Sequence, residues 1–107
     1  MDKNISNQRK SNRIQTIIKV VLLCDYFQYI GTATNCSESG MCIDTPHFIS
    51  PNSNIKIILP IQEEALSLNA KFKRIEKRVN LYDAIGVELL SPPPNYFDFI
   101  QKLQSSL

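Results

Sequence analysis

The sequence predicts a mainly β protein: a small six-stranded antiparallel barrel of the split-barrel type, followed by one C-terminal α-helix. Three observations predict this class. Short runs with apolar side chains at alternate positions recur along the chain, clusters of Asn, Ser, Pro and Gly separate these runs, and the C-terminal segment changes to apolar spacings of three and four. A closed barrel is expected because closure removes strand edges that so small a sheet could not otherwise hide.

The first strand is expected at residues 14–23, which are dense in β-branched side chains. Ile17, Val21 and Leu23 fall on one side of it, and Lys19 interrupts that side. Further strands are expected at residues 29–34, 41–45, 54–61, from 66 into the seventies, and 84–90. The alternation is clearest in 54–61, where the odd-numbered residues form the face expected in the core.

The strand that starts near Leu66 changes phase after Phe72, so that regular alternation would turn Arg74 inward. A β-bulge or strand end between residues 73 and 75 would restore an apolar core face. Gly86, in the middle of the last strand, indicates close backbone approach or a second bulge.

After the Ser91–Pro94 segment stops the sheet, a helix is predicted over about residues 94–106. Its expected packing face consists of Phe97, Ile100, Leu103 and Leu107, and this face should cap the barrel. Residues 1–13 have no apolar periodicity and predict a flexible arm, which leaves residues 14–107 as a single domain.

The 107 residues carry a net charge of only +2, but positive charge is concentrated at residues 1–13 and 71–78. Two local clusters favour a small anionic partner over a long polyanion, and the alternative is a solvated basic face. Phe72 between two lysines is the one feature that would suit single-stranded nucleic acid, so nucleic acid is not the expected partner.

Three cysteines without C-x-x-C spacing predict reduced thiols and neither a disulfide framework nor a metal site. His47 is the sole histidine, and the sequence has neither credibly spaced paired carboxylates nor a phosphate loop, so an enzyme is not expected. The sequence shows no secretion signal and no apolar run of membrane-spanning length. We therefore expect a cytoplasmic protein that does not insert into a membrane.

Two polar motifs indicate where a ligand binds. Asn35, Ser37 and Gly40 form an N-x-S-x-x-G turn between two predicted strands, and this turn offers an amide, a hydroxyl and open backbone. Arg9 and Arg13, upstream in an R-x-x-x-R segment, offer planar cations that fork onto phosphate oxygens or stack on bases.

With these motifs in this order, and with the glycine-bearing strand 85–89 and the terminal helix, the chain resembles the PilZ domain family over nearly its whole length. The resemblance implies a non-catalytic domain that binds the bacterial second messenger cyclic di-GMP and has no cofactor. It assigns Arg9 and Arg13 to the phosphates and guanines. Many relatives carry a further arginine directly before this motif, where this chain has Gln8.

The turn supplies the remaining contacts implied by the resemblance. Asn35 is expected to accept from guanine N–H groups and Ser37 to bind phosphate or base, while Gly40 permits a positive φ or close approach to the ligand. Gln8, Lys10 and Arg74 are possible additional ligand residues.

Ordering of the N-terminal arm over the ligand would then be transmitted to an unidentified downstream partner protein. Two alternative functions remain open from the sequence alone. One is a PilZ-fold adaptor that contacts proteins without binding nucleotide, and the other is a small basic barrel for single-stranded nucleic acid.

Overall fold

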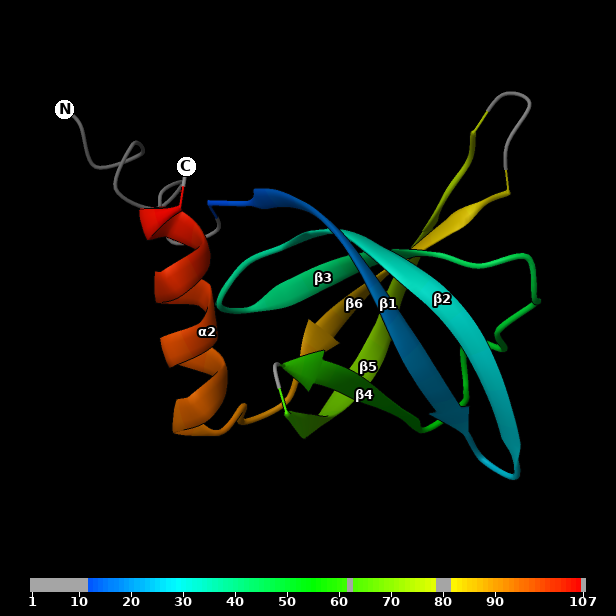
Figure 1. Cartoon of the computed structure of the whole chain (residues 1–107). Helices are drawn as coiled ribbons and strands as arrows, with labels where there is room; N and C mark the ends of the chain where they lie inside the picture. Colours follow the sequence, from blue (N-terminus) through cyan, green and yellow to red (C-terminus); the bar gives the residue numbers. More distant parts are fainter. Residues whose placement is uncertain (1–11, 62, 79–81, 107) are drawn as a thin grey trace, which may run out of the picture.

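The structure, a computed structural model, describes residues 12–61, 63–78 and 82–106. Six antiparallel strands close into a barrel in the order β1-β2-β3-β6-β5-β4, with one helix beside it (Figure 1). The elements are β1 Ile14–Cys24, β2 Phe27–Cys36, β3 Gly40–Asp44, β4 Ile55–Ile61, β5 Glu64–Glu76, β6 Ala84–Leu89 and α2 Pro94–Ser105. The predicted six-stranded barrel and C-terminal helix are confirmed. Most of the predicted N-terminal arm lies outside the described residues.

Apolar side chains at alternate positions fill the barrel interior, as predicted for β4 and β6. In β4, Ile57 and Leu59 are fully buried. In β6, Val87 and Leu89 belong to the same core cluster, so their strand neighbours Gly86 and Glu88 belong to the outer face.

In β1 the buried side is the opposite of the side on which the sequence pattern placed its apolar residues. Val20 and Leu22 are buried, whereas Ile17 is 87% exposed. The physical reason is Lys19, which shares a side with the odd-numbered residues and is exposed, so that side faces solvent.

The predicted bulge in β5 is confirmed. Its register with β6 shifts between Phe72 and Arg74, and Arg74 then pairs with Gly86. Because the extra residue reverses the alternation, Arg74 is exposed instead of pointing into the core.

Helix α2 lies at one end of the barrel (Figure 1) and starts at Pro94, a favoured first helical residue. Its buried residues are Tyr96 and Ile100, whereas Phe97, expected on the packing face, is 39% exposed. Ile100 is buried as predicted and Leu103 packs against the core, whereas Phe97 was misplaced, and Leu107 lies outside the described residues. Tyr96 takes the inward place because its hydroxyl finds a buried partner, described below.

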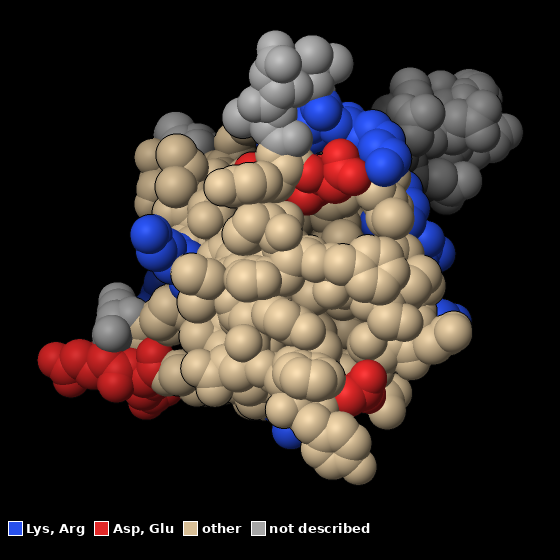
Figure 2. Space-filling view, turned by 90° about the vertical axis from the view of Figure 1, so that its right-hand side faces the viewer, with Lys and Arg blue, Asp and Glu red and all other residues tan. Residues whose placement is uncertain are grey.

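The side of the molecule turned away from α2 is largely free of charged side chains (Figure 2). Turns and loops between strands reach this side in Figure 1, and they carry exposed aromatic residues. These are Tyr26, Phe48 and Tyr82, and Phe27, the first residue of β2, is exposed next to Tyr26. Exposed aromatic rings of this kind are enriched at protein interfaces.

Candidate functional site

The turn between β2 and β3 is built around the Ser37 side chain. Ser37 Oγ accepts hydrogen bonds from the backbone N–H groups of Gly40 at 3.2 Å and Ser39 at 3.3 Å. The Ser37 N–H donates to the Gly40 carbonyl at 2.9 Å. Since Ser37 is only 1% exposed, its hydroxyl, predicted to contact a ligand, is used to shape the turn.

Helix α2 anchors this turn from inside the protein. The Tyr96 hydroxyl donates to the Ser37 carbonyl at 2.6 Å, and Tyr96 is fully buried. Burial raises the pKa of Tyr96, with a further contribution from the neighbouring Cys36, so the phenol stays protonated and remains a donor. No sequence pattern predicts this contact, because the two residues are 59 positions apart.

Gly40 is required for close packing and not for a positive φ, since no glycine in the chain has one. A Cβ at this position would lie 2.7 Å from the Val87 carbonyl oxygen. Of the two roles expected for Gly40, a positive φ is therefore excluded, and close approach to a ligand stays a prediction. The close approach is between β3 and β6, where Gly40 pairs with Glu88.

Arg13 joins the two sequence motifs. Its Nη1 donates to Asn35 Oδ1 at 2.7 Å, and its Nη2 lies 3.8 Å from the place of a Cβ on Gly40. The arginine of the first motif therefore lies across the glycine of the second. Arg13 is exposed and Asn35 is partly exposed, so both can reach a ligand.

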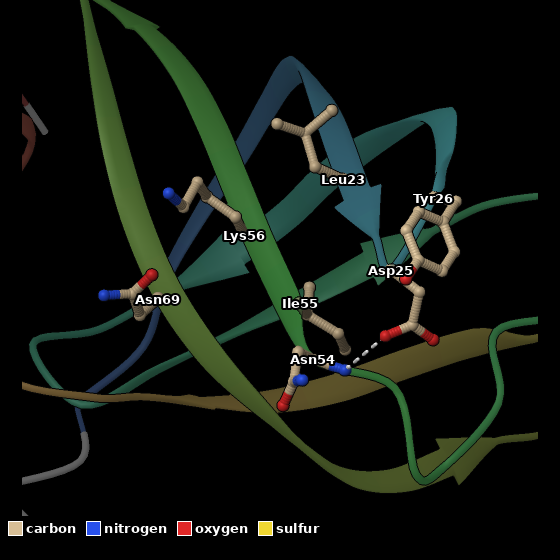
Figure 3. A pocket seen from close by; sticks show the side chains of 7 residues that line it. All are labelled: Leu23, Asp25, Tyr26, Asn54, Ile55, Lys56 and Asn69. Atoms are coloured by element: carbon tan, nitrogen blue, oxygen red, sulfur yellow. Dashed lines mark hydrogen bonds between the residues drawn. The ribbon is translucent and has the colours of Figure 1, made fainter.

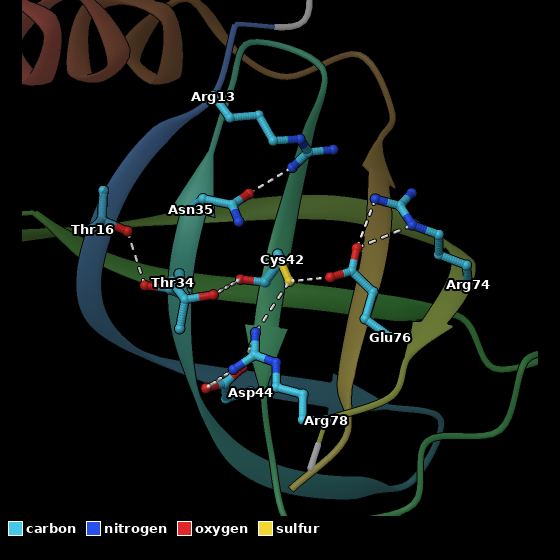
Figure 4. Close-up of polar contacts among 10 residues, drawn as sticks. Arg13, Thr16, Thr34, Asn35, Cys42, Asp44, Arg74, Glu76 and Arg78 are labelled. Carbon is cyan, nitrogen blue, oxygen red and sulfur yellow. Dashed lines mark hydrogen bonds and ion pairs between the residues drawn. The ribbon is translucent and has the colours of Figure 1, made fainter. Parts of the chain in front are cut away.

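Strand pairing extends this site across the barrel surface. Asn35 of β2 pairs with Cys42 of β3, Cys42 pairs with Gly86 of β6, and Gly86 pairs with Arg74 of β5. These four residues form one cross-strand row, which we call the Asn35–Arg74 row. In Figure 4 the Arg13 and Arg74 guanidinium groups extend toward each other over this row.

Two ion pairs lie along the same outer surface (Figure 4). Arg74 Nη2 is 2.8 Å from Glu76 Oε2, and Arg78 Nη2 is 2.9 Å from Asp44 Oδ1. The Cys42 thiol lies between them, donating to Glu76 at 3.5 Å and accepting from Arg78 at 3.9 Å. Burial raises the pKa of Cys42, which keeps the thiol protonated and unreactive.

Glu76 is the ionised centre of this cluster. Burial by itself would raise its pKa, but hydrogen bonds from Cys42 and Arg74 and the positive charge of Arg74 outweigh burial and lower it. The sequence analysis did not select Glu76, Asp44 or Arg78. Glu76 could have been found from the alternation of side chains after the bulge, because residues 74 and 76 lie on the same side of β5.

Three further predicted ligand residues, Gln8, Arg9 and Lys10, lie outside the described residues. Arg13, Asn35, Ser37 and Gly40 are brought together around one turn, and Arg74 lies at the far end of the Asn35–Arg74 row. Of these, Ser37 and Gly40 face inward or pack against backbone, whereas Arg13, Asn35 and Arg74 have side chains accessible to solvent.

A separate pocket of about 500 Å³ lies beside the β1–β2 turn, away from these motifs (Figure 3). Asp25, Tyr26, Asn54, Lys56 and Asn69 supply its polar lining. None of the predicted ligand residues lines it, so it does not enlarge the site around Arg13. Across the described ranges, no group of His, Cys, Asp and Glu is arranged to hold a metal ion.

No helix in the described part of the chain is both long and apolar enough to span a bilayer. Among the residues of the site, the arginines, the asparagine amide and the acidic partners provide hydrogen bonds and charge. This arrangement is suited to binding a planar or anionic ligand.

Comparisons with known proteins identify the fold and the family of this chain. The family model of the PilZ domain matches residues 7–105. The fold is similar to Bacillus subtilis inhibitor of motility (MotI/DgrA), with a TM-score of 0.75 and 13% identity over 92% of this chain and 50% of that one. This chain thus matches about half the length of that protein.

A second similar structure is the PilZ domain of CeSA from a cellulose-synthesizing bacterium, with a TM-score of 0.62 and 20% identity. The match covers 89% of this chain and 97% of that domain. No curated protein sequence matches. Because the family model covers most of the sequence, the chain belongs to the PilZ domain family.

Proposed function

We propose that this chain is a non-catalytic receptor for cyclic di-GMP that binds the ligand beside the β2–β3 turn. The PilZ family binds cyclic di-GMP and partner proteins. The observation that carries the proposal for this chain is the 2.7 Å hydrogen bond from Arg13 to Asn35, because it joins the two polar motifs on one accessible surface.

Each proposed contact follows from the chemistry of its side chain. Arg13, with Arg9 from the same motif, forks onto phosphate oxygens or a guanine edge. The Asn35 amide can donate to and accept from guanine. Ser37 and Gly40 support the site indirectly, since the first closes the turn and the second lets β3 approach β6.

Calorimetric titration with cyclic di-GMP tests the proposal. We expect saturable binding by the intact chain and at least about a tenfold loss of affinity for Arg13→Ala, because a charge-assisted contact is removed. Lys56→Ala on β4 is the charge-matched control and should bind as the native chain does. Absence of binding by the native chain, or equal binding by Arg13→Ala, would refute this site.

Signal transfer to a protein partner is the second part of the proposal. The largely uncharged side with exposed aromatic residues supports a protein contact there, since such rings anchor interfaces. If the ligand also orders the N-terminal arm, amide exchange across residues 1–14 should slow when cyclic di-GMP is added. Unchanged exchange in a ligand-saturated sample would exclude this route.

The redox state of the cysteines fits a reducing compartment such as the bacterial cytoplasm, where we place the protein. Cys24, Cys36 and Cys42 are all unpaired and buried. Burial raises the pKa of each thiol, so none resembles a reactive catalytic cysteine.

A further inference from the structure

We infer that Arg74 is a base-stacking residue of the ligand site and that Glu76 is the residue that positions it. This inference rests on the proposed function, since it assigns one contact within the same ligand surface. It concerns the planar face of the Arg74 guanidinium and a purine base of the ligand.

The first support is the contact between Arg74 and Gly86. A Cβ on Gly86 would lie 3.2 Å from both Cζ and Nη1 of Arg74, and 3.3 Å from its Cγ. The guanidinium group therefore packs against the β6 backbone, where an added Cβ would require the Arg74 side chain to shift by a few tenths of an ångström. The Arg74 side chain is still 50% exposed, so part of the group remains open to a ligand.

The second support is the orientation imposed by Glu76. Arg74 donates to Glu76 Oε2 from Nε at 3.1 Å and approaches the same oxygen with Nη2 at 2.8 Å. Two contacts along one edge restrict rotation of the guanidinium plane. The Cys42 thiol donates to the other carboxylate oxygen, so Glu76 is itself held in place.

The ion pair also decides which contact suits Arg74. A carboxylate at 2.8 Å offsets much of the positive charge, which makes Arg74 a poorer point-charge partner for phosphate. The ion pair does not remove the flat, delocalised face of the guanidinium group, which is the part of an arginine that stacks on aromatic rings. Arg13, which donates to the neutral amide of Asn35, is the better phosphate ligand.

The position of Arg74 in the Asn35–Arg74 row brings this plane within reach of the same ligand. Three strand spacings of about 5 Å separate the backbones of Asn35 and Arg74. The two intervening positions carry Cys42, which has a short side chain, and Gly86, which has none. The long Arg13 and Arg74 side chains extend toward each other over this interval (Figure 4).

The test measures cyclic di-GMP affinity by calorimetry for four variants. We expect Arg74→Ala and Arg74→Lys to lose affinity equally, by about tenfold, because lysine keeps the charge and lacks the stacking plane. Glu76→Gln should lose about threefold, although simple electrostatics predicts tighter binding of an anion when a carboxylate is removed. Lys56→Ala controls for the loss of one positive charge.

A nuclear magnetic resonance readout separates stacking from a structural role. Adding cyclic di-GMP to the native chain should shift the Arg74 Nε–H proton upfield, as a base ring lying over the guanidinium requires. Far-ultraviolet circular dichroism confirms that each variant is folded.

The outcomes separate this inference from the proposed function. Native binding with unchanged affinity in Arg74→Ala would overturn the role of Arg74 and leave the receptor proposal intact. Full affinity in Arg74→Lys would assign Arg74 to phosphate and overturn stacking, and tighter binding by Glu76→Gln would overturn the positioning role. Absence of binding by the native chain would refute both proposals.

Discussion

Two arginine–glycine pairs lie at opposite ends of the Asn35–Arg74 row, and they are held in different ways. Arg13 lies across Gly40, a glycine forced by a backbone contact with Val87. Arg74 lies across Gly86, where the three atoms nearest to an added Cβ all belong to the arginine side chain. The first pair belongs to a turn tied into the core, and the second is fixed by contacts on the surface.

This difference indicates that the contacts under Arg13 stabilise the fold, whereas the contacts under Arg74 position a ligand-binding side chain. The turn under Arg13 is anchored by the buried Tyr96 hydroxyl, so changes there should alter stability first. The surface under Arg74 depends on an ion pair whose side chains are 50% and 34% exposed, so changes there should alter stability little. Four predictions test this contrast, beginning with the largest effect.

Gly40→Ala should lower the free energy of unfolding by about 3 kcal/mol, because its methyl group would meet a backbone oxygen that side-chain rotation cannot move. Urea denaturation monitored by circular dichroism measures the loss. A stability within experimental error of the native value would show that β3 and β6 can separate without cost, contrary to the contact at 2.7 Å.

Tyr96→Phe should lower the free energy of unfolding by about 2 kcal/mol, because the buried Ser37 carbonyl loses its 2.6 Å donor. Tyr82→Phe is the matched control, since Tyr82 is 63% exposed and should tolerate loss of its hydroxyl. Equal stability of the two variants would mean that Tyr96 does not anchor the turn.

Gly86→Ala should change the free energy of unfolding by less than about 1 kcal/mol, because the atoms it meets belong to a flexible side chain and alanine is favoured over glycine within a strand. Comparing this loss of stability with that of Gly40→Ala separates the effect of a methyl group that meets backbone from that of one that meets a side chain. A loss as large as that of Gly40→Ala would contradict the contrast between the two ends of the row.

The smallest effect should appear in acid. Because the pKa of Glu76 is lowered in the folded state, its stabilising contribution is complete above the ordinary glutamate value, about 4.3, and is lost as pH falls through the folded-state pKa. Screening limits it to less than about 1 kcal/mol. Unfolding of the native chain and Glu76→Gln, compared at neutral pH and near pH 3, should show the difference shrinking in acid.

Local patterns predicted the strands better than they predicted the site. Alternation identified the core faces of β4 and β6, and the phase change after Phe72 located the bulge, because both depend on neighbouring residues. The spacing in α2 identified the buried Ile100 but missed Tyr96, because Tyr96 is selected by a partner in a distant turn. Likewise, sequence spacing grouped Asn35 with Ser37, although only Asn35 bonds to Arg13 and Ser37 is buried.

The bulge in β5 has a consequence for changes in chain length. Lys73 is the extra residue between the positions that pair with Val87 and Gly86. Deleting it would bring Arg74 next to Phe72 and restore regular alternation, with Phe72 toward the core and Arg74 toward solvent as before. A deletion elsewhere in this strand would exchange the faces of the residues that follow. Lys73 therefore marks the point in β5 where the barrel can lose a residue and keep its inside and outside.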